Sequence, residues 1–125
     1  MPNIVEFEHI LKYRASASTP PTTRFQEDQS FTTEEKIEGE TRLPDSSATV
    51  ELSMGLIAEG LFFYMKSDEP IAVYFGDPVT TDPVVANFLV LGVDAGEGFT
   101  EVHLVNDNGN TDVATVEYLI AGDAT

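Results

Sequence analysis

The sequence contains no cysteine and no tryptophan, and only six of its 125 residues are lysine or arginine. The absence of cysteine excludes a disulfide framework, thiolate chemistry and cysteine-based zinc sites. The absence of tryptophan counts against a carbohydrate site with an indole platform. Because basic residues are so few, the formal net charge is −16, and such a chain repels nucleic acid and anionic lipid.

Long apolar runs are also missing. No stretch reaches the roughly 18 apolar residues of a membrane-spanning helix. The segment Met1–Glu8 lacks the basic and apolar regions of a signal peptide, so we expect neither feature. Apolar residues nevertheless make up 42% of the chain, which is enough for the core of one domain of this length.

The acidic charge is uneven along the chain. Residues 49–125 hold thirteen acidic side chains and a single basic one, Lys66. These carboxylates must therefore face water, cations, or the lysine and arginine side chains of a partner. A solvated surface that keeps the protein soluble is one interpretation, and basic partners or bound cations are the others.

Apolar residues alternate with polar ones along much of the chain, which predicts β-strands. The expected strands cover residues 5–14, 32–43, 50–54, 61–65, 71–75, 86–93, 102–105 and 113–120. They predict an all-β fold, a single antiparallel β-sandwich of jelly-roll type with about eight strands and an extended N-terminal arm or loop. Within one compact domain, we expect residues 1–36 to form the N-terminal strand and arm, and residues 37–125 the sandwich core.

Two segments predict β-hairpins. The aromatic-rich runs Leu61–Met65 and Ile71–Phe75 are separated by the polar segment Lys66–Pro70, so we expect two strands joined by a short loop. The first run is apolar on both faces, which predicts a central strand. Asn108-Gly109 between two apolar runs is a strong hairpin signal near the C-terminus.

The segment Ala15–Gln29 is polar and contains Pro20-Pro21, which predicts a loop or an extended arm. Such an arm can lie across a neighbouring subunit, although an ordinary surface loop has the same composition. If the chain binds a partner, Phe25 and Phe31 are the expected apolar anchors. The charged edge strand that follows would add polar contacts through Glu34, Glu38 and Arg42.

No catalytic motif is present, and we predict that the protein is not an enzyme and holds no cofactor. His9 and His103 both lie in predicted strands, with no nucleophile elbow to accompany them. We interpret both as half-buried strand residues.

The segment Asn106–Asp112 is rich in oxygen ligands, which makes it a weak calcium candidate. A turn built on Asn-Gly explains the same residues. The loop Asp77–Asp82 is a weaker candidate of the same kind. The calcium ligands would be Asp107, Asn110 and Asp112.

Three segments carry a resemblance to a known group of proteins. Residues 66–73, Lys-Ser-Asp-Glu-Pro-Ile-Ala-Val, resemble a K-S-D-x-P-I/V-x-V element of small virion proteins of tailed bacteriophages. In that group, a segment similar to Gly39–Pro44 precedes a short strand. Elements similar to Leu104–Asn106 and Ala114–Glu117 close the domain. The order is the same in this chain, and the resemblance covers roughly residues 37–122.

This resemblance implies a β-sandwich component of the virion that is assembled in the host cytoplasm. The expected function is that of a capsid decoration, or cement, protein, which binds and stabilises the shell of the major capsid protein as a homo-oligomer, with a trimer favoured. A neck or tail accessory protein is the alternative within the same group. A carbohydrate-binding or calcium-binding β-sandwich module is the alternative outside it. Neither nucleic acid nor membrane is an expected partner.

Overall fold

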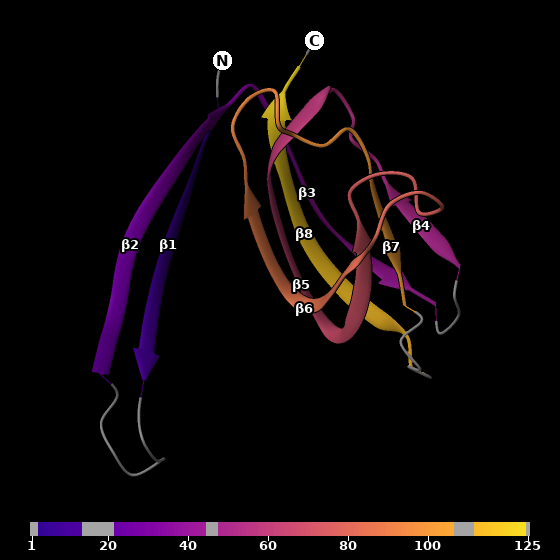
Figure 1. Ribbon diagram of the computed structural model, residues 1–125, viewed down its shortest axis with the longest axis horizontal. Helices are drawn as coiled ribbons and strands as arrows, with labels where there is room; N and C mark the ends of the chain where they lie inside the picture. The colour runs from indigo at the N-terminus through magenta and orange to yellow at the C-terminus, as the bar shows by residue number, and fades with distance from the viewer. Residues whose placement is uncertain (1–2, 14–21, 45–47, 107–111, 125) are drawn as a thin grey trace.

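The computed structural model describes residues 3–13, 22–44, 48–106 and 112–124 (Figure 1). The regular structure of these residues is entirely β-strand, as the alternating pattern predicts. The strands are β1 (Asn3–Tyr13), β2 (Thr22–Thr33), β3 (Glu35–Leu43), β4 (Thr49–Leu52), β5 (Glu59–Tyr74), β6 (Val84–Gly92), β7 (Val102–Val105) and β8 (Ala114–Asp123). The described part of the chain has no helix long and apolar enough to cross a membrane.

The strands divide between two antiparallel sheets. Strands β1 and β2 pair with each other, and β3 to β8 form a curled six-stranded sheet with the order β3-β8-β5-β7-β4 and β6 on the other side of β5. A single unit of about eight strands is therefore not seen, and the prediction of a β-sandwich or jelly roll is not confirmed. The prediction of an all-β antiparallel fold is confirmed.

The predicted hairpin at residues 61–75 is wrong, because both apolar runs belong to the single strand β5. This strand pairs with β6 on both sides of a register shift between Lys66 and Ile71. Two side-chain hydrogen bonds lie in the shifted segment: the Ser67 hydroxyl accepts one from the Glu69 amide (3.2 Å), and Asp68 Oδ1 accepts one from the Thr115 amide of β8 (2.8 Å). The chain therefore bends at this bulge instead of reversing.

The predicted Asn-Gly hairpin segment lies between β7 and β8, which pair with different parts of β5. Strand β8 pairs with residues 59–67 of β5, and β7 pairs with residues 72–74. The two strands thus follow one another along β5 on either side of the bulge, and in the described residues they do not pair with each other. The turn itself, residues 107–111, lies outside the described residues.

The core lies within the curl of the six-stranded sheet. Because β5 bends, residues from both of its halves, with others from β3, β4, β7 and β8, pack into one apolar cluster. Its fully buried members include Leu43, Phe63, Met65, Ile71, Val73, Val102, Leu104, Val116 and Ile120. As predicted, β5 is a central strand, since it lies between β6 on one side and β7 and β8 on the other.

The N-terminal ribbon is more ordered than its composition suggests. The loop that was one of the two structures predicted over residues 15–29 is wrong for residues 22–29, because these lie in β2, which pairs with β1 from Tyr13↔Thr22 to Asn3↔Thr33. The extended arm stays a prediction. The pairing partner, rather than any apolar pattern in β2 itself, makes this polar segment a strand. Figure 1 shows the ribbon projecting beside the larger sheet and joining it where β2 runs into β3.

Candidate functional site: an apolar edge strand and a histidine–carboxylate cluster

Strand β6 is an apolar strand at the edge of the sheet. Residues 84–92 read Val-Val-Ala-Asn-Phe-Leu-Val-Leu-Gly and contain no charged side chain, although the chain as a whole carries −16. In the described residues β6 pairs with β5 alone, so its other edge is unpaired. Val85 and Phe88 are 54% and 56% exposed. Natural sheets usually protect such edges with charged residues, with proline or with a segment that covers the edge. The sequence of β6 contains neither a charged residue nor proline.

Aromatic side chains continue this apolar surface onto β5. The rings of Tyr64 and Phe88 meet edge to face, with their centroids 6.0 Å apart. The Tyr64 hydroxyl donates a hydrogen bond to Glu117 Oε1 on β8 at 3.1 Å. We call Tyr64, Val85 and Phe88 the β6 surface. It is apolar on the β6 side and is bordered by a carboxylate on the β8 side.

The contact with Glu117 leads to a prediction about pH. Burial, then the hydrogen bond to Glu117, then the negative charge of Glu117 raise the pKa of Tyr64 above its ordinary value of 10.0. The folded protein therefore holds this proton more tightly than the unfolded chain. The resulting stability is present below about pH 10 and is lost as the pH rises through the folded pKa. Absorbance titration of tyrosinate should show a late component from Tyr64.

The Tyr64→Phe variant should remove this late component and leave the other tyrosines unchanged. Glu117→Gln should return the component toward the ordinary tyrosine range, because it removes the nearby charge. A titration curve that keeps its late component in Tyr64→Phe would contradict the assignment.

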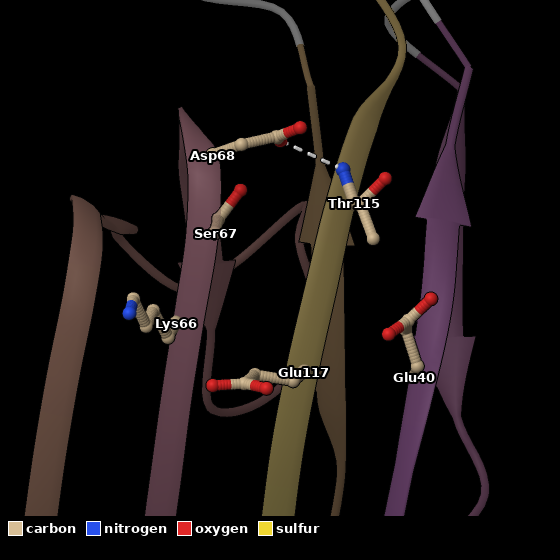
Figure 2. Close-up of a pocket in the computed structure, with 6 residues that line it drawn as sticks. All are labelled: Glu40, Lys66, Ser67, Asp68, Thr115 and Glu117. Carbon is tan, nitrogen blue, oxygen red and sulfur yellow. Dashed lines mark hydrogen bonds between the residues drawn. The ribbon is translucent and has the colours of Figure 1, made fainter.

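A pocket of about 440 Å³ lies between β3, β5 and β8, and Figure 2 shows the six residues that line it. Glu117 is the cross-strand partner of both Glu40 and Lys66, so two carboxylates and one ammonium group lie in a row across the sheet. Asp68 bonds to the Thr115 amide, which holds the start of β8 against the bulge of β5. This hydrogen bond gives Asp68 a structural role. The pocket is lined by Glu40, Lys66, Ser67, Asp68, Thr115 and Glu117.

A second polar cluster lies between β4 and β7. His103 is the cross-strand partner of Glu51, and Glu101 lies two residues before His103. The distances from His103 Nε2 are 3.3 Å to Glu51 Oε2 and 3.6 Å to Glu101 Oε1. The histidine side chain is 14% exposed, and the two glutamates are 61% and 38% exposed. One ligand atom from each of the three residues lies within 4.8 Å of the others, so the cluster can hold a metal ion.

The residues predicted to contact a partner are placed separately. Glu38 and Arg42 are exposed on β3, and Glu34 is exposed just before it. Strand β3 is at an edge of the sheet, as predicted, and Lys36 Nζ lies 3.9 Å from Glu38 Oε1. Phe25 and Phe31 lie in β2, but their side chains are outside the part of the structure that is described.

One of the three calcium candidates, Asp112, lies among the described residues. Asp107 and Asn110 lie outside the described residues. Asp112 is exposed, and its carbonyl accepts a hydrogen bond from the amide of the buried Asn106 at 2.8 Å. In the loop Asp77–Asp82, the weaker calcium candidate, Asp77 Oδ1 accepts a hydrogen bond from the Val79 amide at 2.9 Å. This bond gives the Asp77 carboxylate a role in stabilising a turn.

Sequence reasoning missed the two features that the structure makes prominent. Strand β6 was predicted, but nothing in its pattern indicated that one edge would be unpaired. His103 was expected to be half-buried, and it is, but its proximity to Glu51 follows from strand register, which periodicity does not reveal.

Comparisons of the chain with protein-family models, with curated proteins and with solved structures found no match.

Proposed function

We propose that this chain is a non-enzymatic structural protein of a tailed-bacteriophage virion, a capsid decoration protein that forms a homo-oligomer on the shell of the major capsid protein. The virion role rests on the resemblance of residues 37–122 to small phage virion proteins. The assembly role rests on one observation, the unpaired and uncharged edge of β6. A neck or tail accessory protein is the alternative.

An exposed edge strand of this kind favours pairing with another strand. The unpaired backbone groups of β6 can be satisfied by strand addition, and covering Val85 and Phe88 removes apolar surface from water. We infer that the occupant is a second copy of this chain. Two molecules of charge −16 repel each other over most of their surfaces, and β6 is a nine-residue strand without a charge.

The β1–β2 ribbon supports assembly independently. A two-stranded ribbon is marginally stable in water by itself, so it benefits from packing against another surface. Its register places Val5 opposite Phe31, and Leu11 opposite Phe25. We propose that this ribbon packs against a neighbouring subunit, with Phe25 and Phe31 as its anchors.

The assembly role predicts that charge on the β6 surface abolishes self-association. The double variant Val85→Glu/Phe88→Glu should sediment as a monomer in analytical ultracentrifugation, whereas the wild-type protein sediments as an oligomer. The matched control is Leu56→Glu/Val79→Glu, at apolar positions that are 74% and 89% exposed and lie outside the strands. It should associate like the wild type. A monomeric wild type, or an oligomer that survives in the β6 variant, would refute the β6 interface.

The virion role has a separate test, the copy number of the chain in particles purified from the source culture. Quantitative mass spectrometry should find it at a level comparable to that of the major shell protein. About a dozen copies would instead indicate a neck or tail protein. Absence from particles would exclude the virion role without affecting the assembly result.

A further inference from the structure

We propose that Glu51, Glu101 and His103 bind one Zn²⁺ ion and thereby fasten β4 to β7. The cluster lies in the acidic part of the chain, where Lys66 is the single basic side chain among residues 49–125. Within the described residues, His103 is the one ion-pair partner of either glutamate. Two carboxylates therefore converge on one imidazole, and no lysine or arginine of the described residues forms an ion pair with them. This inference does not depend on the virion role.

The spacing of the ligand atoms suits a tetrahedral ion. With bonds of about 2.0–2.2 Å to nitrogen and oxygen, two ligands of a tetrahedral zinc ion lie about 3.3–3.6 Å apart. The distances from His103 Nε2 to the two carboxylate oxygens are 3.3 and 3.6 Å. One oxygen of Glu51 and one of Glu101 also lie within 4.8 Å of each other, so a movement of these carboxylates would complete the set, and water would fill the remaining position.

The ligand types select the metal. Calcium and magnesium take oxygen ligands, and a histidine nitrogen is foreign to their usual sites. Zinc binds imidazole and carboxylate together, and neutral imidazole is its common ligand in proteins. A mixed set of one histidine and two glutamates therefore favours Zn²⁺ over the calcium that the acidic loops suggest.

The position of the cluster indicates what the ion would do. Strand β4 has four residues, lies at the end of the sheet and pairs with β7. Glu51 comes from β4, while His103 comes from β7. Glu51 and Glu101 also line an open hollow at the surface, which offers the ion a way in. Bound zinc would thus link an edge strand to its neighbour and stabilise the folded state.

Isothermal titration calorimetry of the metal-free full chain with zinc chloride tests the proposal. We expect one zinc ion per chain, and affinity at least about tenfold lower in His103→Ala and in Glu101→Gln. At about 100 times the dissociation constant, zinc should raise the melting temperature by roughly 5–15 °C, because it binds the folded state alone. Cobalt(II) should bind with the intense visible absorption of a tetrahedral site.

Two control variants separate this site from general attraction of cations to an acidic protein. His9→Ala removes the other histidine, and Glu97→Gln removes an exposed carboxylate from a loop. Both should bind zinc like the wild type. The proposal is overturned by absence of zinc binding, by zinc affinity that His103→Ala leaves unchanged, or by calcium binding as tightly as zinc. Glu101→Gln, at a half-buried carboxylate, keeps the test valid if His103→Ala fails to fold.

Discussion

Replacing Phe63 by alanine is expected to lower the free energy of unfolding by about 3–5 kcal/mol. Phe63 is fully buried at the centre of β5. Its ring meets Phe75 edge to face at 5.2 Å between centroids and Phe99 at 6.2 Å. Alanine removes the contacts of the Phe63 ring with Phe75 and Phe99 and leaves a cavity that the sheet cannot close, because the neighbouring strands are held by their backbone ladders. The loss is a large fraction of the stability of a typical domain.

Chemical denaturation with urea measures this effect, and Phe88→Ala is the matched control. Phe88 is also a phenylalanine of the six-stranded sheet, but it is 56% exposed on β6. We expect Phe88→Ala to change the free energy of unfolding by less than about 1.5 kcal/mol, since it loses one ring contact and little burial. Equal losses in the two variants would contradict the assigned core.

Replacing Gly122 by alanine is expected to cost at least about 3 kcal/mol, and it can prevent folding altogether. A Cβ atom at Gly122 would lie 2.0 Å from the carbonyl oxygen of Glu59 and 2.9 Å from the Cα atom of Gly60. Both obstacles are backbone atoms of β5, so a rotamer change cannot relieve the clash. Gly122 is also paired with Glu35 on its other side, which prevents β8 from moving away from β5.

Gly39→Ala is the control for this prediction. Gly39 also lies in a strand, but its Cβ atom would meet the hydroxyl of Tyr118 at 3.2 Å, which is the end of a side chain that can shift. Alanine in a strand also loses less conformational freedom on folding than glycine. We therefore expect stability within about 1 kcal/mol of the wild type. Thermal melting of both variants distinguishes the two sites, and a mild Gly122→Ala variant would show that β5 and β8 are not this close.

The strands themselves were largely predictable, but their connections were not. The run Ile71–Phe75 was correctly expected to be a strand, yet it continues the strand before it. The proline-containing segment between the two runs has the composition of a turn, and a bulge uses the same residues. Within this segment Asp68 bonds to Thr115, a residue 47 positions away. No local pattern records that contact.

Acidic and amide side chains were the least predictable part of the chain. The sequence suggests that Glu59 is an ordinary surface carboxylate. In the structure it accepts hydrogen bonds from the amides of Gly96 and Gly98, and it thereby holds the turn that contains these glycines against β5. Asn106 reads as a turn residue or a cation ligand. Its amide is buried, and it donates hydrogen bonds to the carbonyls of Pro44 and Asp112. Each role depends on a distant backbone group that the fold brings near.

The sequence by itself determined that the protein is an acidic, disulfide-free, all-β chain, because composition and a period of two are properties of each segment alone. Only the tertiary structure decided which strands are neighbours. It joined two apolar runs into β5, left β6 at an edge, and brought Glu51 beside His103. The physical reason is that alternation specifies which face of a strand is buried, whereas partner and register depend on burial summed over distant segments.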